Sequence, residues 1–327
     1  MDRADTWIGR AMRRREDPRL ITGHGRYAAD NRPDGLVHLA VARAGMPRAR
    51  VVQVDLESAR TMPGVIGVWT AADLGLSRPT MPEGVPVPDG MPGRPVLAAD
   101  HVQYAGDALA VVAAETEYQA RDAAEAVFVE LEPVDGDHQA AGSVTGGFGD
   151  AGAAFAGAPV VVRGRLRMGK ICGAALEPRA ATAQWDAGSE TLTIRASVGW
   201  VFGLRDAVAA CLGLQPGQVV ALTEDVGGSF GAKNSPYPEY IMAAALARSL
   251  RRPVRWVATR TEDGPAWTWA RTSAGAPCRR TTTSPTWSPP TASRRYSWRW
   301  SGASRPGRRP PTSAAAGARW ATSGSSG

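Results

Sequence analysis

The sequence predicts an α+β protein that contains two successive folded regions and a C-terminal segment without a hydrophobic core. At 327 residues the chain is long enough for two ordinary domains. Short runs of β-forming residues alternate with segments of helical periodicity as far as residue 263. Beyond residue 263 there is no Leu, Ile, Val, Met or Phe. A chain of that composition cannot bury enough apolar surface to fold, so residues 264–327 are predicted to be a disordered tail.

The first folded region is predicted over residues 18–135, after an N-terminal arm of residues 1–17. Apolar, β-branched runs predict strands at 36–43, 51–56, 65–70 and 107–115. Residues 116–127 are predicted to form a helix with Thr116 as its N-cap, because alanines and a valine share one face and charged residues the other. Proline and glycine crowd residues 78–95, which predicts a surface loop.

The second folded region is predicted over residues 160–263, after a linker at 136–159 that is rich in Gly and Ala. Strands are predicted at 191–198, 218–225 and 253–260, and helices at 204–214 and 238–250. The stretch DVGGSFGAK, residues 225–233, therefore joins a strand to a helix.

The charge of the chain is concentrated in its tail. The formal net charge is +7, and residues 264–327 contain ten arginines and no acidic residue, so the rest carries 7 − 10 = −3. Nucleic-acid binding by the folded regions is therefore discounted, and binding through the basic, Trp-containing tail stays a remote alternative.

We hypothesise that the tail results from a frameshift near Gly264 in a GC-rich gene. DNA sequencing that finds no apolar-patterned alternative frame would refute this.

Cysteine and histidine are too scattered to indicate a metal site. Cys172, Cys211 and Cys278 lie far apart and form no C-x-x-C, so neither a disulfide framework nor a cysteine-ligated zinc or iron-sulfur site is predicted. Each cysteine is expected to be a small buried residue.

No apolar run follows the N-terminal arginines, so no signal peptide or membrane anchor is predicted and a cytoplasmic location is expected.

The glycine-rich stretch 225–233 fits three known motifs poorly. A nucleophile elbow around Ser229 requires a later histidine, but the last histidine is His138, 91 residues upstream. A phosphate-binding P-loop requires lysine directly after glycine and then a hydroxyl residue, whereas here an alanine precedes Lys233 and Asn234 follows it. The dinucleotide-binding fingerprint G-x-G-x-x-G also fails, because Ser229 stands where its second glycine is required.

Two interpretations of this stretch remain open from its composition. Its glycines either let backbone amides approach an anionic ligand, with Phe230 presenting an apolar face, or simply form a tight turn. Asp225 is interpreted as a turn or cap residue, and Glu239 as an acid that complements the positive end of the following helix. Lys233 is either a clamp for the loop or a solvated charge.

Several stretches together resemble the large subunit of the molybdenum hydroxylases, the family of xanthine dehydrogenase, aldehyde oxidase and carbon monoxide dehydrogenase. The resemblance covers about residues 8–263. It rests on GRAMRRREDPRLITGHGRYAAD, on RPVLAADHVQYAGDALAVVAAETEYQARDAAEAVFVELEP, on LEPRAATAQWD, on DVGGSFGAK with NSPYPEY, and on RRPVRWVATRTED, which occur in the family's order. It implies an N-terminal α/β hammerhead-like domain followed by a partial molybdopterin-binding α/β domain.

The resemblance also implies an activity and its partners. Such a subunit binds a molybdopterin-type molybdenum cofactor and either hydroxylates an aldehyde or N-heterocycle with oxygen from water or oxidises carbon monoxide. A small-molecule substrate is implied, and electrons leave through an iron-sulfur subunit that carries [2Fe-2S] and a subunit that carries FAD. No membrane partner is implied.

The resemblance implies cofactor contacts for specific residues. Gly228, Ser229, Phe230 and Gly231 fall on the pterin-contacting segment, and Gly199 stands where the family has a glutamine beside the metal. Ser229 replaces a third glycine. The general-base glutamate is expected beyond residue 263, so no catalytic residue is assigned. The alternative is therefore a truncated fragment without activity.

Overall fold

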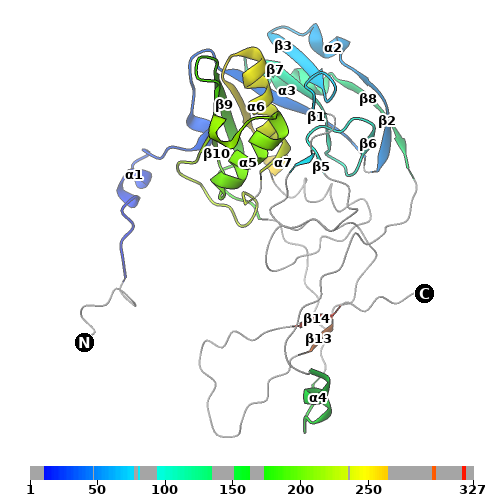
Figure 1. The fold of residues 1–327 in the computed structure, drawn as a ribbon, viewed down its shortest axis with the longest axis vertical. Helices are drawn as coiled ribbons and strands as arrows, with labels where there is room; N and C mark the ends of the chain where they lie inside the picture. The colour runs from blue at the N-terminus through cyan, green and yellow to red at the C-terminus, as the bar shows by residue number, and fades with distance from the viewer. Residues whose placement is uncertain are drawn as a thin grey trace.

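A seven-stranded mixed β-sheet forms the centre of the folded region in the upper part of Figure 1. The computed structural model describes residues 11–46, 48–76, 80–81, 94–134, 151–162, 173–234, 236–263, 297–299 and 319–321. The strands of the sheet are β1 (Val37–Arg43), β3 (Val65–Thr70), β7 (Ala108–Ala114), β9 (Ala180–Asp186), β10 (Thr191–Ala196), β11 (Val219–Leu222) and β12 (Val254–Val257). Their order is β11-β10-β9-β12-β1-β7-β3.

The sheet is continuous across the predicted interdomain linker. Strand β12 runs parallel to β1, with Val254 opposite Val37 and Trp256 opposite Leu39. β10 and β11 are also parallel, and the other neighbouring pairs are antiparallel. The predicted boundary at 136–159 stays a prediction, and this stretch contains the short helix α4 (Ala151–Ala156). Strands from both sides of the predicted boundary therefore share one sheet.

Smaller sheets accompany the central one. An antiparallel three-stranded sheet has the order β6-β2-β8, where β2 is Ala49–Asp55, β6 is His101–Val102 and β8 is Phe128–Pro133. The remaining strand pairs are β4 (Thr80–Met81) with β5 (Arg94–Pro95) and β13 (Ser297–Arg299) with β14 (Arg319–Ala321). Most of the predicted loop at 78–95 and the rest of the predicted tail lie outside the described residues.

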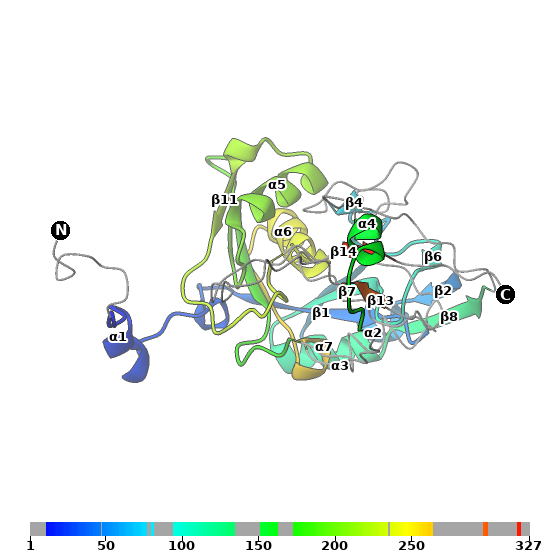
Figure 2. The ribbon, with the colours of Figure 1, turned by 90° about the horizontal axis from the view of Figure 1, so that it is seen from below.

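Helices cover both faces of the central sheet (Figure 2). Helices α5 (Val201–Leu212) and α6 (Pro238–Leu250) pack on one face, in a core that includes Leu39 of β1. Helices α2 (Glu57–Arg60) and α3 (Glu117–Glu125) pack on the other face, where Ala42 contributes from the same strand. Leu39 and Ala42 face opposite sides of the sheet because successive side chains of a strand point in opposite directions. Strand β1 is therefore apolar on both sides.

The α6 helix is buried along most of its length. Its apolar residues from Pro238 to Ala247 are buried all round, as expected for a helix enclosed between a sheet and α5. Tyr240 packs edge to face on Trp256 of β12, with 6.1 Å between the ring centroids. This helix follows the glycine-rich loop, so its packing fixes where the loop ends.

The secondary structure largely confirms the sequence expectations. Thr116 caps α3 through its side chain, which accepts a 3.3 Å hydrogen bond from the Gln119 amide. The predicted strands at 36–43, 65–70 and 107–115 and the helix at 238–250 are present. The strand predicted at 253–260 is shorter, because the chain turns into α7 (Arg260–Asp263). Strands β8 and β9 were not among the predicted strands.

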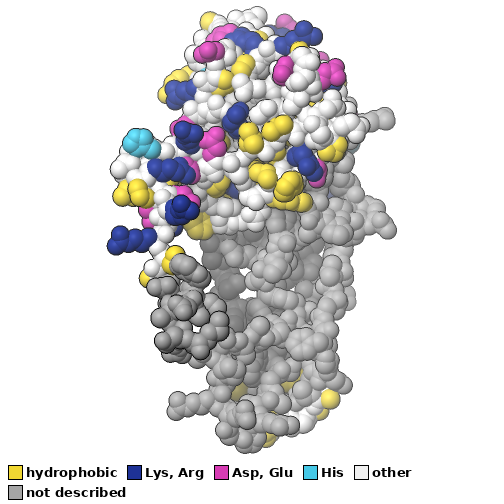
Figure 3. All heavy atoms as spheres, turned by 60° about the vertical axis from the view of Figure 1, so that its left-hand side comes forward, with side chains coloured by type: hydrophobic (Ala, Val, Ile, Leu, Met, Phe, Trp, Pro, Cys, Tyr) yellow, Lys and Arg dark blue, Asp and Glu magenta, His cyan; other side chains and the backbone are white. Residues whose placement is uncertain are grey.

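The residues before β1, 11–31, form an N-terminal segment that extends to the side of the sheet (Figure 1). It contains α1 (Asp17–Ile21) and the 3₁₀ turn η2 (Ala28–Asp30), which contacts β9. On the face in Figure 3, basic and acidic side chains are interspersed over the described surface, and apolar side chains gather between them. Among the described residues, no helix has the length and apolar character needed to cross a bilayer.

Candidate cofactor site

The candidate site is the loop of residues 225–233, between β11 and α6. Its backbone turns sharply through left-handed conformations, with φ of 99° at Gly228, 51° at Phe230 and 86° at Gly231. Glycine adopts such angles freely, whereas a phenylalanine there is uncommon and costs about 1 kcal/mol. The Phe230 side chain is 75% exposed. The loop thus holds an aromatic ring in solvent at an energetic cost.

Four successive backbone amides of this loop are available to a ligand. Among the described residues, the N–H groups of Gly228, Ser229, Phe230 and Gly231 donate no hydrogen bond to protein. The Ser229 carbonyl instead accepts from the Ala232 amide at 2.8 Å. Consecutive amides in a turn that passes through left-handed conformations can form a concave donor set that suits anions. This property favours the ligand-binding interpretation over a plain turn.

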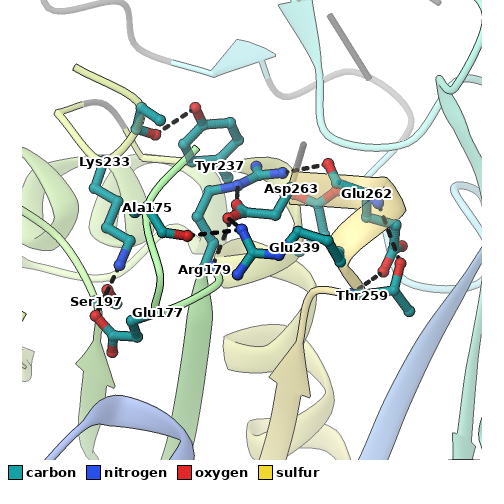
Figure 4. A network of polar contacts seen from close by, with 12 residues as sticks. Ala175, Glu177, Arg179, Ser197, Lys233, Tyr237, Glu239, Thr259, Glu262 and Asp263 are labelled. Atoms are coloured by element: carbon teal, nitrogen blue, oxygen red, sulfur yellow. Dashed lines mark hydrogen bonds and ion pairs between the residues drawn. The ribbon is translucent and has the colours of Figure 1, made fainter. Parts of the chain in front are cut away.

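Glu177 connects the loop to two other segments. Its Oε2 accepts hydrogen bonds from the Gly227 amide at 2.7 Å, from Lys233 Nζ at 2.7 Å and from Ser197 Oγ at 2.8 Å. The Lys233 side chain is 1% exposed and that of Glu177 is 8% exposed. Lys233 is therefore a buried loop clamp and not a solvated charge (Figure 4). Glu177 Oε1 is buried without a partner among the described residues.

Gly227 is required for the close approach of the loop to Glu177. A Cβ atom on Gly227 would lie 2.5 Å from Glu177 Cβ, which is closer than two carbon atoms pack. Besides the hydrogen bond from the Gly227 amide to the Glu177 carboxylate, the Glu177 backbone amide donates to the Gly227 carbonyl at 3.3 Å. The two residues therefore meet along their backbones.

The structure brings Gly199 next to the loop. Its amide donates to the Lys233 carbonyl at 2.8 Å, so the end of β10 and the end of the loop are joined. A Cβ atom on Gly199 would lie 3.3 Å from Asn234 Oδ1. The carboxamide group beside position 199 thus comes from Asn234. All five residues with predicted cofactor contacts lie in one region, and the contacts themselves stay a prediction.

A second polar cluster supports the segment that carries Glu177. Arg179 donates to Asp263 Oδ1 at 2.7 Å, and its guanidinium lies 3.9 Å from the centre of the Tyr237 ring. Tyr237 in turn donates to the Ala232 carbonyl at 2.6 Å. Arg260 donates to the carbonyls of Ala175 and Leu176, each at 2.7 Å. Figure 4 shows Arg179 and Asp263 of this cluster to the right of Glu177.

Glu239 does more than complement the helix end, and the sequence interpretation needs correction here. Its carboxylate is 1% exposed and accepts from Arg43 of β1 at 2.8 Å. Burial alone would raise its pKa, but the charges of Arg43 and Arg179 outweigh burial and hold the pKa below the usual value. Arg43 also bonds Glu262 at 2.8 Å. The Arg43–Glu239 ion pair was missed because its two residues are 196 positions apart.

Asp225 attaches the N-terminal segment, residues 11–31, to the loop. Its carboxylate is bonded by both terminal nitrogens of Arg19, and Oδ2 also accepts from the Arg26 amide at 2.8 Å. The Arg19 hydrogen bonds and then the Arg26 amide lower the pKa of Asp225 to about 2. Asp225 therefore caps no element of its own loop, and its role is contact with a distant segment.

A separate cavity of about 340 Å³ lies between the N-terminal segment and the sheet. It is lined by Arg26, Tyr27, Ala28, Asp30, Asn31, Gln184, Arg195, Ala196 and Glu224. None of the five predicted cofactor residues lines it. The candidate site is thus an exposed loop and not this cavity.

Sequence reasoning missed Glu177 and Arg179 as parts of the site. Both belong to LEPRAATAQWD, which the sequence analysis used only as a point of resemblance. The available signal was the presence of two charged residues, Glu177 and Arg179, immediately before the buried strand β9. Charged residues at such a position are seldom buried unless they are paired.

The fold and the loop define a class of protein, namely a hammerhead domain joined to part of a molybdopterin-binding domain. The family described as "Aldehyde oxidase and xanthine dehydrogenase, a/b hammerhead domain" matches residues 22–135. The family described as "Molybdopterin cofactor-binding domain" matches residues 134–271 and so contains the whole candidate loop.

Individual relatives agree with these matches. The chain is 30% identical over 279 residues to the nicotine 6-hydroxylase large subunit of Paenarthrobacter nicotinovorans, which covers 78% of this chain and 34% of the relative. It is 30% identical to the carbon monoxide dehydrogenase large chain of Hydrogenophaga pseudoflava, over 79% of this chain and 36% of that one. Quinoline 2-oxidoreductase from Pseudomonas putida 86 superposes with a TM-score of 0.70 at 30% identity, over 78% and 35% of the two chains.

The chain therefore belongs to the family of molybdenum hydroxylase large subunits. It spans about a third of the length of these relatives. Relatives are named as large subunits or as a subunit of a dehydrogenase complex, so they function in multi-subunit assemblies.

Proposed function

We propose that this chain forms the cofactor-contacting part of a molybdenum-dependent oxidoreductase, with the loop at 225–233 as its molybdopterin contact. The observation that carries the proposal is the run of four available amides from Gly228 to Gly231, within the region matched by the molybdopterin-binding family. Gly228 and Gly231 adopt left-handed angles, so backbone and ligand can approach closely.

The residues present fit such a cofactor. Molybdopterin carries a phosphate group and a flat pterin, and its recognition requires amide donors and an apolar contact. The loop offers both, through its amides and the exposed ring of Phe230. When bound, the cofactor supplies the two-electron oxidation of substrate with oxygen from water. Lys233 is paired with Glu177, so it is not a free cation at the loop surface.

The protein's own residues would position the cofactor and shield it. The amides of Gly228, Ser229 and Gly231 would bind polar atoms of the cofactor, and the Phe230 ring would limit the access of water and substrate. Gly199 would leave room for Asn234, whose carboxamide lies beside it. No general base is assigned within the described residues.

The names of the relatives support the proposed substrate class, and the family resemblance supports the proposed partners. Their names include a nicotine hydroxylase, a carbon monoxide dehydrogenase and an aldehyde oxidoreductase. We infer that the substrate is an N-heterocycle, an aldehyde or carbon monoxide. We also infer that a [2Fe-2S] subunit and an FAD subunit accept the electrons.

The test is an activity measurement on the tagged protein, isolated from its own cells with its bound subunits. Quinoline, benzaldehyde and carbon monoxide are supplied separately, and reduction of an artificial electron acceptor is followed. Turnover of one substrate class, together with visible absorption of iron-sulfur and flavin groups, would support the proposal. Stoichiometric cofactor with no turnover of any of the three would overturn the assigned substrate class. Absence of molybdenum would favour the inactive-fragment alternative.

A further inference from the structure

We propose that the buried ion pair between Glu177 and Lys233 is a positioning device that holds the glycine-rich loop in its ligand-binding conformation. The carboxylate lies on the segment before β9, and the ammonium lies at the end of the loop. This inference rests on the proposed function for its ligand, but the loop geometry can be tested without the ligand.

The first support is the number of segments that meet at one oxygen atom. Glu177 Oε2 accepts from the loop's start at Gly227, from the loop's end at Lys233 and from Ser197 after β10, all within 2.8 Å. A single acceptor therefore fixes the two ends of the loop relative to each other and to the sheet. The residues with available amides lie between these two fixed ends.

The second support is the cost of the arrangement. Burying two charges is expensive, and an apolar pair of similar size is often as stable or more stable. An apolar side chain could not accept three hydrogen bonds, so the charged residues serve geometry. The close packing of Gly227 on Glu177, where a Cβ would be 2.5 Å away, fits the same interpretation.

The third support is a relay from the pair to Gly199. The Lys233 carbonyl accepts the Gly199 amide at 2.8 Å, and the Lys233 amide donates to Ser229 Oγ at 3.2 Å. Displacement of Lys233 would therefore disturb Gly199 and Ser229 together. Both are residues with predicted cofactor contacts, so the pair acts on the cofactor through them.

The experiment compares Glu177→Gln and Lys233→Met with the wild-type protein by hydrogen exchange without cofactor. We expect the amides of Gly227, Lys233 and Gly199 to exchange at least about tenfold faster in both variants, because local opening exposes them. The matched control is Glu239→Gln, which removes an equally buried charge from the Arg43 pair. The control should lower Tm but leave exchange in the loop unchanged.

Two results would overturn the proposal. One is wild-type exchange at these amides in both variants, and the other is an equal increase in the Glu239→Gln control, which would indicate general destabilisation only. If one clamp variant fails to fold, the other decides the result. Cofactor content forms a separate arm, in which both clamp variants should retain at least tenfold less molybdenum than wild type. A wild-type protein without molybdenum would refute the proposed function. The exchange result would still test whether the Glu177–Lys233 pair holds the loop in place.

Discussion

Arg43 and Glu239 form a buried ion pair, 2.8 Å between Nη2 and Oε1, that joins strand β1 to helix α6. One residue comes from the hammerhead region and the other from the molybdopterin-binding region. The two family-defined regions are thus joined by a charge contact as well as by the shared sheet. Glu262 bonds the same guanidinium and connects α7 to the pair.

Removal of Glu239 should destabilise the folded chain strongly. A Glu239→Ala variant would leave Arg43 buried with one acid partner fewer, and breaking a buried pair costs about 3 kcal/mol or more. Chemical denaturation should therefore show a lower midpoint with an unchanged slope. A loss below about 1 kcal/mol would show that Glu262 alone satisfies Arg43.

Gly227 in the loop and Gly199 beside the loop should respond differently to the same substitution. Gly227→Ala should cost about 1 to 3 kcal/mol, because its methyl group would meet Glu177 Cβ at 2.5 Å. Gly199→Ala should change stability by no more than about 0.5 kcal/mol, because its methyl group would meet the exposed Asn234 side chain at 3.3 Å. Thermal unfolding of the two variants checks this order. Equal losses would contradict the close approach at Gly227.

Phe230 should show a conflict between stability and ligand binding. Phe230→Gly removes the cost of a left-handed non-glycine residue, so the Tm should stay the same or rise by a few degrees. Phe230→Ala keeps the unfavourable angle and should not gain stability. Both variants should bind less cofactor than wild type. Full cofactor content in both would exclude the ring as a contact.

Acid should release the N-terminal segment of residues 11–31 from the loop. The pKa of Asp225 is lowered to about 2, against about 3.9 for an unperturbed aspartate. A lowered pKa means that the contact with Arg19 contributes fully above about pH 4 and is lost as the pH falls through about 2. Pepsin should therefore cleave the N-terminal segment readily at pH 2 and slowly at pH 4. The Asp225→Asn variant should be cleaved readily at both values.

Local sequence signals predicted most of the fold. The cap at Thr116 and the helix at 238–250 depend on residues close in the chain, and both are present. The order of the strands could not be predicted in this way, because the pairing of Val37 with Val254 joins segments more than two hundred residues apart. The continuous sheet across the predicted linker is a consequence of such long-range pairing.

The site was predictable only in part. The loop and Gly199 were identified through their motif and their resemblance, and the structure places them together. The partners of Lys233, Glu239 and Asp225 were not predicted, because each lies on a distant segment. A sequence shows that a charge is present, whereas its burial and its partner depend on tertiary packing.

The measurement that tests the central claim most directly is the molybdenum and pterin content of the protein, expressed in a host that makes molybdopterin. Elemental analysis and pterin fluorescence are compared for wild type and Gly228→Val. The variant puts a branched side chain at φ 99°, where Ala175 Cβ lies 3.3 Å from the added Cβ. We predict about one molybdenum and one pterin per wild-type chain and at least tenfold less in the variant. Equal content in the two proteins, or none in wild type, would contradict the assignment of this loop as the cofactor contact.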